Sequence, residues 1–117
     1  MPDQRARILI VDDDENVLIS LERVLEGAGF STVTAWSGRE AAELLRKSQF
    51  DLLLVDAHLS DLQATDLFQR LPSPVFRFVM FPGSDGAQQL LVPGIDGTVC
   101  KWAHEDITAK IRRCFAA

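Results

Sequence analysis

Hydrophobic positions along the chain follow two alternating patterns. Short runs of consecutive leucine, β-branched and aromatic residues are typical of strands that are buried on both faces of a sheet. Such runs predict five strands, at residues 8–11, 30–36, 51–56, 75–81 and 97–101. Between and after them, apolar residues recur at helical spacing. They predict five helices, through residues 17–28, 37–48, 64–71, 84–91 and 105–115.

Strands that alternate with helices over short connections indicate an α/β fold. Because crossovers between parallel strands are right-handed, we expect one doubly wound, five-stranded parallel sheet in the flavodoxin-like order 2-1-3-4-5. The chain has 117 residues, which suits one domain, so we expect residues 1–117 to form a single domain. In this order the first and third strands are neighbours, and sites in such sheets lie outside the carboxyl ends of the strands.

Both of these neighbouring strands lead into carboxylates. The run Ile8–Val11 is followed by four acids, Asp12 to Glu15, and the run Leu52–Val55 is followed by Asp56. Two carboxylates about 4 Å apart repel by roughly 4 kcal/mol at an effective dielectric near 20, so the cluster calls for a cation. Oxygen ligands without paired histidines suit Mg²⁺ or Mn²⁺. The acids could instead serve only to cap the next helix and stabilise its dipole.

Lys101 ends the fifth predicted strand at the same edge, where it can pair with a carboxylate or a phosphoryl group. Carboxylates, a cation and a lysine together favour electrostatic stabilisation of phosphoryl transfer. A carboxylate oxygen can also be the nucleophile that forms an aspartyl phosphate. Asp56, alone at its strand end, is the better acceptor, whereas Asp12 and Asp13 are the better metal ligands.

Three segments carry a resemblance to a known family. The segments Ile8–Asn16, Asp51–Asp56 and Cys100–Lys101 resemble, in order and approximate spacing, the response-regulator receiver domain of two-component signalling. The resemblance covers essentially the whole chain. It implies a signalling phosphoacceptor that takes its phosphoryl group from a histidine kinase or a histidine phosphotransfer protein. Such a domain takes part in its own phosphotransfer and dephosphorylation and is not otherwise an enzyme.

The resemblance also implies roles for individual residues. Asp56 would be the phosphoacceptor. Asp12, Asp13 and Asp56 would hold Mg²⁺ together with the main-chain carbonyl of His58. Lys101 would bind the phosphoryl group.

The sequence departs from the family pattern at the positions that transmit the phosphorylated state. Phe81 stands where the family has Thr or Ser, Thr98 where an aromatic is usual, and Trp102 where a proline is usual. A hydrogen bond to a charged group contributes about 1.5 to 3 kcal/mol, so a missing hydroxyl would weaken the switched state without preventing phosphorylation. Ser84 could supply a hydroxyl if the fourth strand were longer. Phe81 itself could either fill the core or occlude the site.

These departures leave rival functions open. The chain could be a degenerate receiver that acts as a phosphorylation-independent protein-interaction module. A phosphatase of the haloacid dehalogenase type is a third hypothesis, because Asp12 and Asp14 have Asp-x-Asp spacing. That family expects Thr or Val where Asn16 stands, which disfavours it. Trp36 and Trp102 are expected in the core or partly at the surface, although an exposed Trp102 could anchor a partner.

Composition narrows the partners and the compartment. The hydrophobic and charged fractions, 47% and 25%, are those of a soluble globular protein. A net charge of −5 disfavours direct binding of nucleic acid or an anionic membrane. No apolar run approaches the ~18 residues of a membrane span, so we expect a cytoplasmic protein. Cys100 and Cys114 are expected to be reduced thiols. The output partner and the oligomeric state stay open, a homodimer included.

Overall fold

A five-stranded parallel sheet forms the centre of the computed structural model, which describes residues 5–71, 75–82 and 94–116. The strands are β1 (Arg7–Val11), β2 (Ser31–Ala35), β3 (Leu52–Asp56), β4 (Phe76–Phe81) and β5 (Gly97–Cys100). The helices are α1 (Glu15–Gly27), α2 (Gly38–Lys47), α3 (Ala64–Phe68) and α4 (His104–Cys114). The strand order is β2-β1-β3-β4-β5, so the predicted fold class and topology are confirmed. The helix predicted at 84–91, and with it Ser84, lies outside the described residues.

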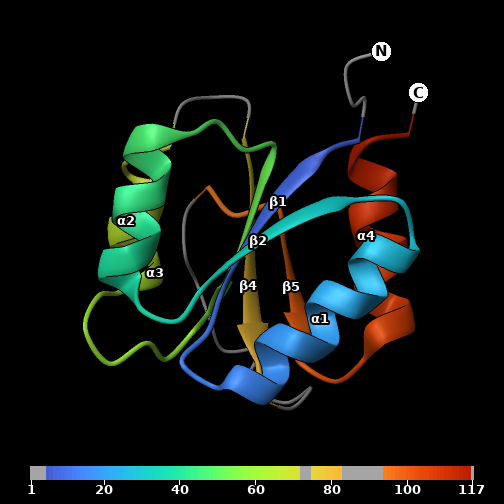
Figure 1. Ribbon diagram of the computed structural model, residues 1–117, viewed down its shortest axis with the longest axis horizontal. Coiled ribbons are helices and arrows are strands. Elements are labelled where there is room, and N and C mark those ends of the chain that lie inside the picture. Colours follow the sequence, from blue (N-terminus) through green and yellow to red (C-terminus); the bar gives the residue numbers. More distant parts are fainter. Residues whose placement is uncertain (1–4, 72–74, 83–93, 117) are drawn as a thin grey trace.

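Helices cover both faces of the sheet. α1 and α4 lie on one face, whereas α2 and α3 lie on the other (Figure 1). β1 is apolar from Ile8 to Val11 because these residues are buried on both faces of the sheet. Ile8 and Ile10 face the cluster under α1 and α4, while Leu9 and Val11 face the cluster under α2 and α3. A strand that is buried on both faces needs an apolar side chain at every position. Within the described residues, no helix is long and apolar enough to cross a membrane.

The segment Ser37–Glu40 has the sequence pattern of a capping box, but the start of α2 departs from the regular form of that motif. As expected, the hydroxyl of Ser37 accepts a hydrogen bond from the N–H of Glu40, at 3.0 Å. The Glu40 carboxylate, however, accepts from the N–H of Trp36, at 2.9 Å, and not from that of Ser37. The reciprocal half of the box is therefore displaced by one residue. The carboxylate still satisfies a backbone donor at the helix entry.

The loop after β3 is tied to the start of α2 by Asp61. Its two carboxylate oxygens accept hydrogen bonds from the N–H groups of Gly38 and Arg39, both at 2.9 Å. Gly38 is needed for this close approach, because a Cβ there would lie 2.6 Å from the Cβ of Leu62. The orphan amides of α2 are thus capped by a residue from another loop.

α3 is shorter than predicted. The helix ends at Phe68, whereas its apolar pattern suggested an end at Leu71. After Phe68 the chain tightens, since the N–H of Arg70 bonds to the carbonyl of Leu67 and the N–H of Leu71 to that of Phe68. These bonds span three residues, as in a 3₁₀ turn, which commonly ends a helix. Leu71 remains buried, so its apolar character is explained without a longer helix.

Candidate functional site

Three carboxylates gather at the carboxyl ends of β1 and β3. Val11 pairs with Val55 in the parallel ladder, so the next residues, Asp12 and Asp56, emerge side by side. Asp12, Asp13 and Asp56 each offer a carboxylate oxygen, and these oxygens lie within 4.8 Å of one another. Asp12 and Asp56 are the buried charged residues of the described core, at 0% and 2% exposed, whereas Asp13 is exposed. The cluster is therefore half inside the protein and open toward solvent at Asp13.

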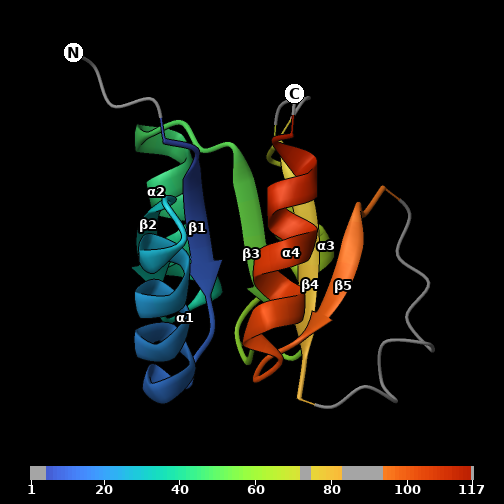
Figure 2. The same ribbon diagram turned by 90° about the vertical axis from the view of Figure 1, so that its right-hand side faces the viewer.

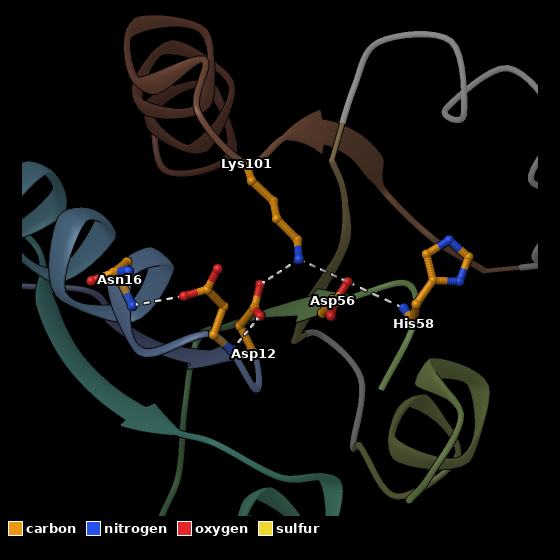
Figure 3. A network of polar contacts seen from close by, with 6 residues as sticks. Asp12, Asn16, Asp56, His58 and Lys101 are labelled. Carbon is orange, nitrogen blue, oxygen red and sulfur yellow. Dashed lines mark hydrogen bonds and ion pairs between the residues drawn. The ribbon is translucent and has the colours of Figure 1, made fainter. Parts of the chain in front are cut away.

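Lys101 brings a positive charge to this cluster from the end of β5, the edge strand that β4 separates from β3. It follows β5, and its backbone N–H donates to the carbonyl of Phe81, at 2.9 Å. Its Nζ lies 3.0 Å from Oδ2 of Asp12 and 3.3 Å from Oδ1 of Asp56 (Figure 3). Only 13% of the lysine side chain is exposed. The ammonium thus bridges the two buried carboxylates and offsets their repulsion.

Burial and neighbouring charges shift the pKa values of Asp12 and Lys101 in opposite directions. Burial raises the pKa of Asp12, and this outweighs the N–H of Asp14 and the ammonium of Lys101, which lower it. Burial alone would lower the pKa of Lys101, but the carboxylates of Asp12 and Asp56 outweigh it and raise that pKa. The lysine is therefore a cation at neutral pH, and Asp12 is the acid that burial penalises most clearly.

The donor set suits a divalent cation. Three carboxylates without a histidine or thiolate ligand form a hard oxygen site. Oδ2 of Asp12 is buried and accepts no well-aligned hydrogen bond in the described part of the chain, although it faces the Lys101 ammonium. This buried oxygen therefore already faces one cation, the Lys101 ammonium, and it fits the donor set of a cation site.

Asp14, the third acid of the opening run, has a structural role. The carboxylate of Asp14 caps α1 by accepting from the N–H of Asn16, at 2.9 Å. Oδ1 of Asp12 accepts from the N–H of Asp14, also at 2.9 Å. The capping interpretation therefore holds for Asp14, while Asp12 and Asp13 turn toward Asp56.

His58 lies beside the acceptor loop. Its backbone N–H donates to Oδ1 of Asp56, at 3.2 Å. Its ring points away from the carboxylates (Figure 3) and meets the Phe81 ring edge-on, with 6.4 Å between the ring centroids. The backbone of His58, and not its imidazole, therefore faces the cluster.

The remaining switch positions do not converge on the cluster. Phe81 is 4% exposed and belongs to the core cluster under α2 and α3, so it fills the core. Thr98 pairs with Val79 inside the sheet, and its carbonyl accepts a hydrogen bond from Lys110. Trp102 is 52% exposed.

Asp61 and Trp36 were not singled out as functional by their sequence positions. Asp61 caps amides 22 and 23 residues away, and no local pattern reveals such a pair. Trp36 is 64% exposed, so of the two expected placements, the core or the surface, it takes the surface one. Trp36 directly follows β2, a strand with four half-buried positions, and this weak burial of the strand is the feature that indicates an exposed tryptophan.

The comparison with known families settles the class of protein. The family model of the response regulator receiver domain matches residues 8–112. This chain belongs to the response regulator receiver family. Membership of this receiver family accounts for the sheet order, the acid cluster and the bridging lysine together.

Individual relatives agree with this assignment. The alginate biosynthesis transcriptional regulatory protein AlgB of Pseudomonas putida is 35% identical over 80 residues, which cover 67% of this chain and 18% of that protein. A CheY-like receiver domain from Methanospirillum hungatei is 26% identical, with a TM-score of 0.81 over 95% of this chain and 94% of that one. The response regulator TrrA of Thermotoga maritima, solved in complex with Mg²⁺ and BeF, is 22% identical, with a TM-score of 0.81 over 92% and 97% of the two chains. At that identity the likeness to TrrA shows the fold alone. The chain spans about a fifth of the length of the curated relatives it matches.

Proposed function

We propose that this receiver domain accepts a phosphoryl group on Asp56 from a histidine kinase or a histidine phosphotransfer protein. The observation that carries the proposal is the meeting of three carboxylate oxygens within 4.8 Å and a lysine ammonium at 3.0 and 3.3 Å from two of these residues. In phosphoryl transfer, catalysis rests mainly on positioning and charge stabilisation. Asp56, Asp12 and Lys101 supply a nucleophile, a metal ligand and a cation within one small volume.

Asp12, Asp13 and Asp56, with the main-chain carbonyl of His58, would hold Mg²⁺ or Mn²⁺. The bound ion would neutralise the charge on the oxygens of the transferring group. Support comes from the hard oxygen donors, from the buried Oδ2 of Asp12 and from TrrA, whose structure contains Mg²⁺ and BeF. Burial of Asp12 strengthens its attraction for a cation, because water screens the charge poorly there.

The chain's own residues would then act on the donor. A carboxylate oxygen of Asp56 forms a bond to phosphorus while the P–N bond of the donor phosphohistidine breaks, and the leaving imidazole takes up a proton. The Lys101 ammonium, already 3.3 Å from Asp56, binds an oxygen of the transferred group. The backbone N–H of His58 holds the acceptor carboxylate in place.

The proposal also includes the location of the domain and the kinds of molecule that it binds. The domain would be cytoplasmic and would contact proteins, and its net charge of −5 disfavours direct binding to nucleic acid or to an anionic membrane. The output partner is unidentified. Hydrolysis of the phosphoryl group from Asp56 would reset the domain.

A second function is favoured by Phe81. Its ring lies in the core and provides no hydroxyl toward the cluster. In this alternative the domain is a degenerate receiver whose binding to a partner protein does not depend on phosphorylation. In this alternative Asp56 would still accept a phosphoryl group, but the outer surface of the domain would change little on phosphorylation.

Intact mass spectrometry after incubation with acetyl phosphate and Mg²⁺ tests the leading proposal. We expect the parent chain to gain one phosphoryl group, Asp56→Asn to gain none, and chelation of the metal by EDTA to prevent labelling. Asp51→Asn is the matched control, because Asp51 lies just before β3, at the opposite end of that strand from Asp56, and accepts from the N–H of Arg7. Absence of label on the parent chain would refute the phosphoacceptor role.

Chemical-shift mapping with beryllofluoride separates the two functions. If the ion perturbs residues near Asp56 and also residues on the outer surface of the domain, the phosphorylation-dependent function is supported. If the shifts are confined to the cluster, the interaction-module alternative is supported instead.

A further inference from the structure

An acidic groove that is lined in part by apolar side chains lies between α1 and the end of β2. This helix and this strand are adjacent in the fold (Figure 2). The volume of the groove is about 320 Å³. It is lined by Glu15, Leu18, Ile19, Glu22, Thr34, Trp36 and Glu40. Trp36 and Ile19 are 64% and 40% exposed, which makes them two of the three exposed large hydrophobic residues in the described chain. Adjacent exposed apolar side chains with a polar rim are typical of an interaction site.

Trp36 is held in a fixed position before any partner arrives. Its indole Nε1–H donates to Oε2 of Glu40, at 3.1 Å, and its backbone N–H donates to Oε1 of the same carboxylate, at 2.9 Å. Both bonds are to one ionised group at the start of α2. A tryptophan that is already ordered loses little rotamer freedom on binding, and large ordered aromatics are frequent hot spots.

The rim of the groove is negative. Among the residues that the structure describes, three glutamates line it and no basic residue does. In the part of the chain that the structure describes, neither Glu15 nor Glu22 forms an ion pair. An unpaired acidic rim attracts a cationic partner and steers its approach.

We propose that this groove docks a basic segment of a partner protein. One apolar side chain of that segment packs on Trp36 and Ile19, while lysine or arginine residues beside it pair with Glu15 and Glu22. The charges argue against two other occupants. A second copy in a two-fold dimer would bring the acidic rims together, and an anionic membrane surface would be repelled. The inference does not depend on phosphorylation of Asp56.

Fluorescence can test the proposal because the chain has two tryptophans. The variant Trp102→Phe leaves Trp36 as the single reporter. We titrate it with a short amphipathic Lys–Leu peptide at low salt and expect a saturable blue shift of the Trp36 emission. A Glu–Leu peptide of the same pattern should give none. Trp36→Phe, which keeps Trp102 as the reporter, should show no shift with either peptide.

Charge reversal at one rim residue then locates the site. In the Trp102→Phe background, Glu22→Lys should weaken the Lys–Leu peptide by about five- to tenfold, since it replaces an attraction with a repulsion. Glu105→Lys is the matched control, because it changes the net charge equally on exposed α4 and does not line the groove. Ile19→Ala should also weaken binding, by about threefold or more. Thermal melts check that each variant is folded.

Several results would overturn the proposal. An unchanged Trp36 spectrum at high peptide concentration means that the groove does not take such a segment. Equal weakening by Glu22→Lys and Glu105→Lys means that binding follows net charge and not this rim. Equal binding of the Glu–Leu peptide excludes the basic chemistry. Self-association that Trp36→Ala abolishes in sedimentation would assign the groove to a second copy of the chain.

Discussion

The ammonium of Lys101 is the counter-charge of two buried carboxylates, and its removal should have a large and specific effect. Lys101→Met keeps the length of the side chain and removes the charge. It leaves Asp12 and Asp56, at 0% and 2% exposed, without the cation now found at 3.0 and 3.3 Å. The variant therefore tests whether the cluster is held together by charge.

The expected magnitude follows from these distances. At an effective dielectric near 20, each ion pair is worth about 5 kcal/mol of Coulomb energy, much of it offset by the cost of burying the charges. Removing one partner of a buried pair typically costs about 3 to 5 kcal/mol. We expect Lys101→Met to lose about 3 kcal/mol of unfolding free energy near pH 7, because Asp12 can relieve part of the strain by taking up a proton. Lys47→Met is the control: its partner Glu43 is 3.8 Å away and both side chains are exposed, so it should lose less than about 0.5 kcal/mol.

The loss should depend on pH and on metal. The pKa of Asp12 is raised by burial, and Lys101 now opposes that rise, so the variant raises it further. An acid with a raised folded pKa contributes stability at low pH that is lost as the pH rises through the folded pKa. The deficit of Lys101→Met should therefore shrink as the pH falls from neutrality toward the ordinary aspartate pKa of 3.8. Mg²⁺ at ten times its dissociation constant would restore about 1.4 kcal/mol.

Urea unfolding in EDTA and in Mg²⁺ measures these quantities. The double variant Asp12→Asn, Lys101→Met should be more stable than Lys101→Met alone, since one uncompensated charge is gone. A loss below about 1 kcal/mol near pH 7, like that of an exposed pair, would refute the reasoning. So would a deficit that is indifferent to both pH and Mg²⁺.

Three further variants test the frame around the site. Burial would raise the pKa of Asp61, but the N–H groups at the start of α2 outweigh it and lower that pKa below 3.8. Asp61→Asn should therefore lose about 1 kcal/mol of unfolding free energy near pH 7, and its stability should fall less steeply below about pH 4. If urea unfolding shows the same dependence on pH in both proteins, this prediction is wrong. Gly38→Ala should lose about 1 to 3 kcal/mol of unfolding free energy in urea, because its Cβ would lie 2.6 Å from Leu62. Gly27→Ala, where a Cβ has open space, should lose none, and equal losses would exclude the steric explanation. Phe81→Thr should cost about 3 kcal/mol yet enlarge the beryllofluoride-induced shifts, and identical shifts in both proteins would refute a role for the hydroxyl.

The sheet and the centre of the site could be predicted because each rests on a short-range pattern. Ile8–Val11 and Leu52–Val55 are apolar at every position, which only a strand covered on both faces requires. Parallel strands place their carboxyl ends at one edge, so the acids after these two runs were bound to meet. Lys101 reaches the same edge for the same reason, from the end of the fifth strand.

What the sequence did not reveal depends on contacts between distant segments. The cap that Asp61 provides to α2 joins residues 22 and 23 positions apart. The early end of α3 reflects a tightened turn that keeps Leu71 buried. The exposure of Trp36 arises because Glu40 holds its indole at the surface. None of these contacts alters a hydrophobic period, so none leaves a trace in the pattern of a single sequence.

Phe81 separates two tasks that one residue could otherwise combine. Its carbonyl accepts the backbone N–H of Lys101 and so helps to fix the lysine over Asp12 and Asp56, whatever side chain the residue carries. Its ring packs into the core and against His58, where it offers nothing to a phosphoryl oxygen. The main chain at this position therefore supports the proposed chemistry, while the side chain favours a rigid core over a residue that moves. On this argument, the proposed phosphorylation of Asp56 and the proposed response of the outer surface are separable, and labelling and chemical-shift mapping should be measured on the same variants.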